Sequence, residues 1–95
     1  MNAEHVEELY RVICRITSPE DCKAFFEDLC TYKEIEQMSE RLNAAKLLME
    51  GKTYDEIIAR ADISSATLSR VSKCVKYADG YNRVLGSKKE QTEQK

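Results

Sequence analysis

The 95-residue sequence contains no tryptophan, one proline, three glycines and one histidine. The shortage of proline and glycine excludes collagen-like chains and argues against a disordered chain, because both classes are rich in these residues. Hydrophobic residues make up 42% and charged residues 34%, which is typical of a globular, helix-rich protein. A chain of this length predicts one domain, and most metabolic enzymes need more chain than this to build a closed pocket.

Long apolar runs are also absent. No run approaches the roughly 18–20 residues that a membrane-spanning helix needs. The N-terminal stretch MNAEHVEELY is acidic and has no apolar signal core. We therefore expect a soluble, cytoplasmic protein with no membrane partner.

The four cysteines form no CxxC pair, and His5 is the only histidine. This pattern favours small, reduced core residues over a disulfide scaffold or a zinc site, so no metal is expected. No nucleophile is paired with a base and no glycine loop could cradle a phosphate, so an enzyme is the least favoured class.

Charge is distributed unevenly along the chain. Residues 1–50 carry six Lys or Arg against eleven Asp or Glu, whereas residues 51–95 carry nine against six. The stretch from Ile63 to Ala78 contains Arg70, Lys73 and Lys76 and no acidic residue. This asymmetry is compatible with an acidic scaffold joined to a segment that contacts a polyanion.

Apolar residues recur at three- and four-residue spacing throughout, which predicts an all-α helical bundle. Start signals precede the helices at Ser18-Pro19, Thr31–Glu34, Thr53–Glu56 and Ser64, and stop signals lie at Gly51 and Asp79-Gly80. The predicted stripes are Val6, Leu9, Tyr10, Ile13 and Ile16; Cys22, Phe25, Phe26, Leu29 and Cys30; Ile35, Met38, Leu42, Ala45 and Met49; and Leu68, Val71, Val75 and Ala78. We expect a single domain over residues 1–86 and a polar, disordered tail over 87–95.

Two short predicted helices, separated by Asp62, Ile63 and Ser64, form a helix-turn-helix over residues 53–78. The residues expected to face inward are Ile57, Ala61, Ile63, Leu68 and Val71. Asp62 takes the place at which such a turn needs left-handed backbone. Ile58 takes the place at which a small residue usually lets the two helices cross.

The second helix of this motif presents small residues first and cations later. Small side chains allow close approach to base edges in a major groove, and cations can meet phosphates. The predicted DNA-contacting residues are Thr53, Tyr54, Ser64, Ser65, Ala66, Thr67, Ser69, Arg70 and Lys73. The alternative is a helical protein-interaction module that keeps the helix-turn-helix as a scaffold without binding DNA. The stripes before the motif offer more apolar surface than a small monomer covers, which favours a homodimer.

The segments TYKEIEQMSERLNAAKLLMEG (31–51), DISS (62–65) and ATLSRVSK (66–73) resemble the Trp repressor family, most closely its YerC/YecD-type branch. The resemblance implies an all-helical, intertwined homodimer that binds operator DNA through its recognition helix and represses transcription.

The resemblance also implies effector positions at Thr31, Arg41 and Arg70. In tryptophan-dependent members a glycine follows the second arginine and a serine helps to hold the ligand's amino group. Val71 and Cys74 stand at those two positions here, which argues against L-tryptophan as corepressor. The effector is then another small molecule, or none.

Overall fold

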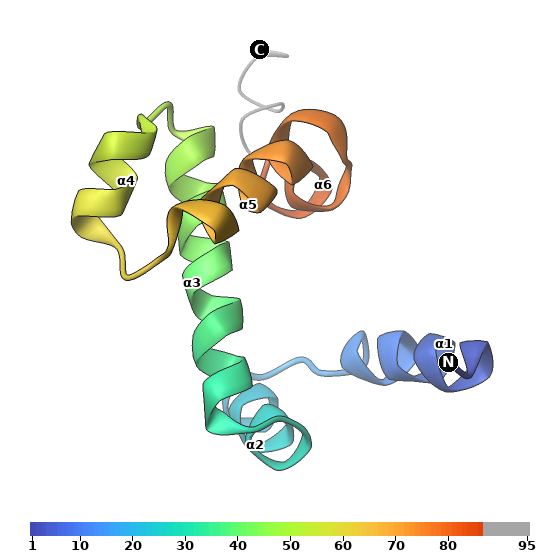
Figure 1. Cartoon of the computed structure of the whole chain (residues 1–95). Coiled ribbons are helices and arrows are strands. Elements are labelled where there is room, and N and C mark those ends of the chain that lie inside the picture. Colours follow the sequence, from blue (N-terminus) through green and yellow to red (C-terminus); the bar gives the residue numbers. More distant parts are fainter. Residues whose placement is uncertain (87–95) are drawn as a thin grey trace. The chain divides into compact units, whose positions relative to one another are not determined.

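Six helices make up residues 1–86, the part of the chain that this computed structural model describes (Figure 1). They are α1 (Ala3–Ile13), α2 (Pro19–Leu29), α3 (Tyr32–Met49), α4 (Tyr54–Arg60), α5 (Ser65–Tyr77) and α6 (Gly80–Leu85). The predicted all-α class is confirmed. The predicted tail at 87–95 lies outside the described residues. The chain divides into two compact units, one over residues 1–35 and one beginning at Glu36.

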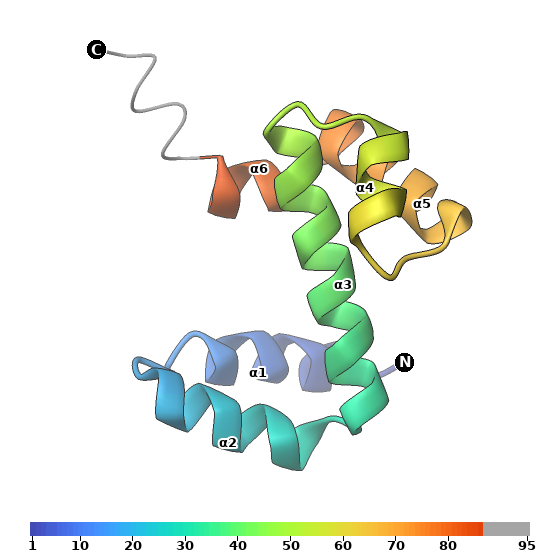
Figure 2. The same cartoon turned by 90° about the vertical axis from the view of Figure 1, so that its left-hand side faces the viewer.

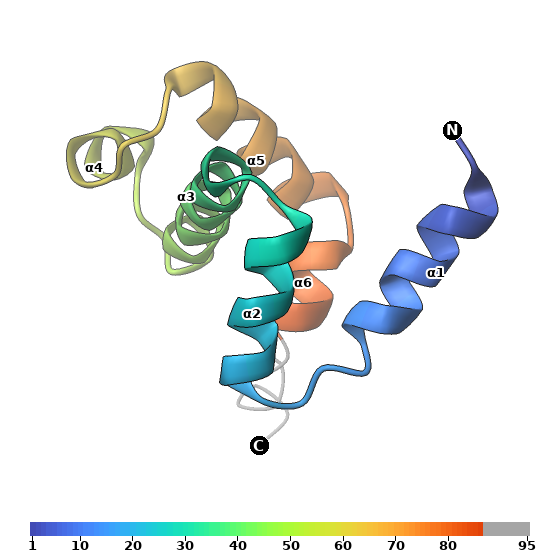
Figure 3. The ribbon, with the colours of Figure 1, turned by 90° about the horizontal axis from the view of Figure 1, so that it is seen from below.

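The first unit contains α1, α2 and the start of α3 (Figure 3). Ser18 caps α2 as predicted, because its side chain accepts a hydrogen bond from the Asp21 N–H and Pro19 opens the helix. α1 ends at Ile13, so Ile16 falls in the following turn and not on the helix as predicted. Neither α1 nor α2 contains a buried residue. Their apolar faces therefore find little cover within the described chain.

Helix α3 begins and ends at the predicted signals. The Thr31 N–H donates to Glu34 Oε1 at 2.8 Å, and the Glu34 N–H donates to Thr31 Oγ1 at 3.1 Å, which completes a capping box. At the other end Gly51 has a φ of +93°, the left-handed conformation that glycine adopts without strain. The Gly51 N–H donates to the Leu48 carbonyl and the Lys52 N–H to the Leu47 carbonyl, the pattern of a Schellman motif.

The core of the second unit lies where α4 and α5 pack against the C-terminal half of α3 (Figure 2). Ala44 and Ala45 of α3 and Ile57 of α4 are fully buried there. Leu68 and Val71 of α5 complete the buried cluster. The residues that pack against it are Leu47, Leu48, Ala61, Ile63, Val75, Tyr81 and Leu85.

Two positions of the stripes predicted for the second unit are not buried. Leu42 is 45% exposed, and Ala44 is buried instead. Ala78 is exposed because α5 ends at Tyr77, one residue before it. Side-chain volume made Leu42 the stronger apolar signal, but the crossing of α4 and α5 over α3 selects the smaller residue.

Helix α6 is tied to the end of α5 by a side chain. Asn82 Nδ2 donates to the Val75 carbonyl at 2.9 Å and to the Ala78 carbonyl at 3.4 Å. These contacts satisfy carbonyl groups that the end of α5 leaves without a helical partner. Asn82 therefore fixes the last turn of α5.

Adjacent isoleucines of α4 provide a test of this core. Ile57 is fully buried, whereas Ile58 is 42% exposed. Ile57→Ala should lower the free energy of unfolding by about 2–5 kcal/mol, because it removes buried methylene groups and leaves a cavity. Ile58→Ala should lower it by less than about 1 kcal/mol. Urea unfolding followed by circular dichroism at one protein concentration measures both, and equal losses would contradict the packing described.

Candidate nucleic-acid interface

The two helices of the predicted motif are present, but the link between them differs from the expectation. Ala61 has φ −113° and ψ 151°, and Ser64 has φ −74° and ψ 156°, so both ends of the link are extended. Among residues 1–86 no residue other than glycine has a positive φ. The expectation of left-handed backbone at Asp62 is therefore wrong. An extended link needs no left-handed residue, so an aspartate there carries no conformational cost.

The inward-facing residues of the motif are confirmed. Ile57, Leu68 and Val71 are each at most 1% exposed, and Ala61 and Ile63 are half-buried against them. Ile58 does not stand at the helix crossing, because 42% of its surface is exposed. The large Ile58 side chain therefore does not obstruct the packing of α4 against α5.

Thr53 caps α4 through the predicted capping box. The Thr53 N–H donates to Glu56 Oε1 at 2.8 Å, and the Glu56 N–H donates to Thr53 Oγ1 at 3.2 Å. The backbone hydrogen bond from Thr53 is the main reason that the pKa of the Glu56 carboxyl lies below its ordinary value of 4.5. Tyr54 follows as the first residue of α4 and is 41% exposed.

Ser64 and Thr67 are used by the start of α5 itself. Ser64 Oγ accepts from the Thr67 N–H at 3.1 Å and donates to Thr67 Oγ1 at 3.0 Å. Both hydroxyl groups therefore already hold partners. Ser65 and Ala66, which come between them, are exposed.

The outward face of α5 is built by the helical repeat. Ala66, Arg70, Lys73 and Tyr77 follow one another at spacings of four, three and four residues and are all exposed. This row, which we call the outer stripe, lies on the side of α5 opposite Leu68 and Val71. Lys76 is exposed on one flank of it, and Ser69 is half-buried on the same flank. The prediction from sequence placed Arg70 and Lys73 outward but missed Tyr77, which lies seven residues after Arg70.

The cations of the outer stripe have no acidic partner among the described residues. Two ion pairs form within residues 1–86, Glu8–Arg11 at 3.0 Å and Asp79–Arg83 at 3.5 Å, and neither includes Arg70 or Lys73. α5 also has no acidic residue in its first turn. Its N-terminal partial charge is therefore not offset by its own side chains.

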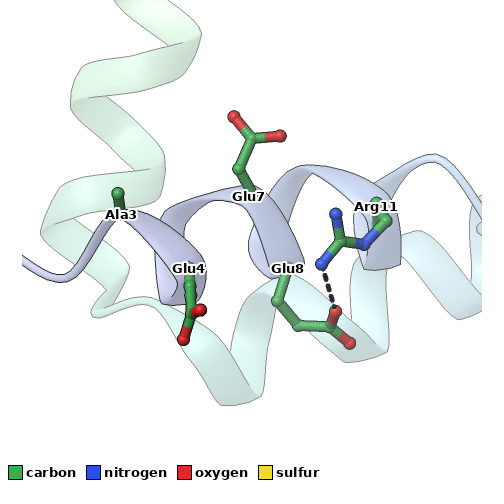
Figure 4. A pocket seen from close by; sticks show the side chains of 5 residues that line it. All are labelled: Ala3, Glu4, Glu7, Glu8 and Arg11. Carbon is green, nitrogen blue, oxygen red and sulfur yellow. Dashed lines mark hydrogen bonds and ion pairs between the residues drawn. The ribbon is translucent and has the colours of Figure 1, made fainter.

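Hollows elsewhere among residues 1–86 include the following two. One is formed along α1 by Ala3, Glu4, Glu7, Glu8 and Arg11, where Arg11 already pairs with Glu8 (Figure 4). Because one exposed helix supplies all five residues, this hollow has no opposing wall. The other, of about 430 Å³, lies in the second unit and is lined by Leu42, Cys74, Ala78, Gly80, Tyr81, Val84 and Leu85. Its lining is almost entirely apolar.

Comparison with known proteins identifies the family. The Trp repressor protein family matches residues 4–89 of the chain. This chain belongs to the Trp repressor family. It is 37% identical to the uncharacterized protein YerC of Bacillus subtilis (strain 168), over 95% of this chain and 88% of that protein. It also resembles the crystal structure of a candidate Trp repressor from Staphylococcus aureus, with a TM-score of 0.85 and 35% identity over 93% of this chain and 89% of that one.

A Trp repressor fold also implies a place for L-tryptophan, and the residues present do not fit it. Val71 stands where the tryptophan-dependent repressors have glycine, and its side chain is 1% exposed within the core. Cys74 lines the apolar cleft and offers a sulfur atom, a weak acceptor for an ammonium group. At the position where the resemblance places the ligand, the Val71 side chain is therefore part of the hydrophobic core.

The three predicted effector residues have different settings. Thr31 belongs to the first unit and its hydroxyl accepts the Glu34 N–H, as the capping box requires. Arg41 is half-buried on α3, and Arg70 is exposed on the outer stripe. Arg41 and Arg70 belong to the second unit. The capping role predicted for Thr31 is confirmed.

The capping box of α4 generates a pH prediction. Since the pKa of Glu56 is lower in the folded chain than its ordinary value of 4.5, its contribution to stability is fully present above that value. The contribution is lost as the pH falls through the lower, folded pKa. Below pH 4.5 the wild-type chain should therefore lose more of its free energy of unfolding than Glu56→Gln does, because the amide cannot be protonated. Urea titrations from pH 3 to pH 7 measure this, with Glu27→Gln at an exposed site on α2 as control. Parallel profiles for wild type and Glu56→Gln would contradict it.

Proposed function

We propose that this chain is a sequence-specific DNA-binding regulator that acts as a transcriptional repressor. The observation that carries the proposal is the exposed face of α5, which presents the small residues Ser65 and Ala66 at its start and the cations Arg70 and Lys73 after them. The segment from Ile63 to Ala78 contains no acidic residue. A recognition helix reads base edges with its N-terminal residues and contacts phosphates with its cations.

The proposal assigns different tasks to different residues. Ser65 and Ala66 are small and exposed, so they allow the start of α5 to approach base edges closely. Ser69, half-buried beside them, supports the same approach. Arg70 and Lys73 contact phosphates. Ser64 and Thr67 cap the start of α5. In the proposal they contribute to base reading by holding this end of the helix in position at the groove.

The start of α4 supplies a second contact in this proposal. Thr53 and Tyr54 stand at its N-terminus, but Asp55 and Glu56 in its first turn offset the positive end of the helix dipole, so the contact depends on a hydroxyl donor. The Tyr54 hydroxyl is the stronger donor of the two, because the Thr53 hydroxyl and N–H are engaged with Glu56.

The homodimer belongs to the same proposal. Leu9, Tyr10, Leu29 and Tyr32 keep between 36% and 83% of their surfaces exposed, and α1 and α2 bury no residue. A second copy of the chain would cover these side chains, which lowers the cost of exposing them to water. Two recognition helices related by a two-fold axis then require an operator with matching symmetry.

Selection of bound duplexes from a random pool tests the function directly. The purified chain at near-physiological salt should enrich one pseudo-palindromic motif with half-sites about 34–36 Å apart, or a multiple of that. Enrichment should be equal with and without L-tryptophan, because Val71 fills its place. Enrichment only with L-tryptophan would contradict the expectation that binding is independent of tryptophan. No enrichment in either arm would favour the protein-interaction module that the acidic N-terminal half also suits.

The salt dependence of binding tests the phosphate contacts. Arg70→Ala and Lys73→Ala should each weaken binding to all duplexes to a similar degree. Each should reduce the slope of log K against log salt by about 0.9 per chain, because one phosphate contact and its counterion release are lost. Lys23→Ala, an exposed cation on α2, is the control and should leave the slope unchanged. An unchanged slope for both α5 variants would contradict the assignment.

A further inference from the structure

Tyr77 is an aromatic side chain that the fold does not explain. It occupies the last turn of α5 and keeps 84% of its surface exposed. Tyr81, four residues later, packs against the core instead. An aromatic ring left in water costs free energy that folding does not recover, so Tyr77 is more easily explained by a contact with another molecule.

The position of Tyr77 on α5 indicates which molecule. It ends the outer stripe, four residues after Lys73 and seven after Arg70, on the side opposite Leu68 and Val71. Lys76 precedes it directly. The nearest acid along the chain, Asp79, pairs with Arg83 at 3.5 Å. The charged residues nearest to Tyr77 along α5 are therefore the cations Lys73 and Lys76, which suit a polyanion.

The length of α5 locates the contact. With a rise of about 1.5 Å per residue, the row from Ala66 to Tyr77 extends over about 16 Å. A major groove is about 12 Å wide. When the start of α5 approaches the base edges, the end of the helix has passed the groove and lies over the sugar-phosphate backbone.

We propose that Tyr77 is a positioning residue for operator DNA: its hydroxyl donates to a backbone phosphate and its ring packs on the adjoining sugar. This inference rests on the proposed DNA-binding function. The contact fixes the angle at which α5 enters the groove and reads no base. Because the donor is uncharged, the contact releases no counterion.

The test is duplex binding by Tyr77→Phe over a range of salt concentrations, with the full chain. Loss of one hydrogen bond per chain should weaken binding about three- to tenfold for each of the two chains that contact the operator, on every duplex, and leave the salt slope unchanged. Tyr77→Ala should weaken it further, because the ring contact is lost as well. Lys73→Ala differs, since it lowers the slope. Lys23→Ala, at an exposed site on α2, is the control and should leave binding unchanged.

The outcomes separate this inference from the function on which it rests. If wild type binds no duplex, the proposed function fails and the inference fails with it. If wild type binds and Tyr77→Phe binds equally well, the inference alone is overturned. A changed salt slope, a changed preferred sequence or a loss of thermal stability in Tyr77→Phe would also overturn it, because each indicates another role. Equal weakening by Lys23→Ala would show a non-specific effect and overturn it too.

Discussion

The close packing of α4 and α5 on Ala44 and Ala45 of α3 is the constraint on which the rest of the second unit depends. Both alanines are fully buried, and their small side chains let Ile57 and Leu68 reach α3 from the two neighbouring helices. Once Leu68 faces the core, the helical repeat determines which residues of α5 lie on the opposite, exposed side. The outer stripe is therefore a consequence of core packing and not of any contact on the surface.

Capping places a second limit on how α5 can meet a partner. The first four backbone N–H groups of a helix lack acceptors within the helix. The Ser64 hydroxyl accepts one of them, the Thr67 N–H, and also donates to the Thr67 hydroxyl. The Ser64 hydroxyl has thereby used its only hydrogen and one of its lone pairs, so it has little left to offer a base edge. If α5 is the recognition helix, as proposed, the residues best placed to approach base edges are the exposed neighbours Ser65 and Ala66.

Local signals in the sequence predicted most of this arrangement. Ser18, Thr31, Thr53 and Ser64 begin helices because their side chains satisfy N–H groups a few residues away, which needs no knowledge of the fold. Predictions failed where distant packing decides. The exposure of Leu42 and the extended backbone at both ends of the link that contains Asp62 depend on how the helices pack. The roles of the DNA-contacting residues stay predictions.

Val71 shows how one position can connect stability to ligand dependence. Its side chain is 1% exposed and completes the cluster formed by Ile57 and Leu68, so it stabilises the helix pair that presents the outer stripe. A glycine there would leave room for a ligand but would remove that packing and weaken α5 through its backbone freedom. A bound ligand could then replace the missing contacts, and binding would order the recognition helix. In this chain valine supplies those contacts permanently. Core packing thus holds α5 in place without a ligand. This is the physical reason to expect that the proposed DNA binding does not depend on tryptophan.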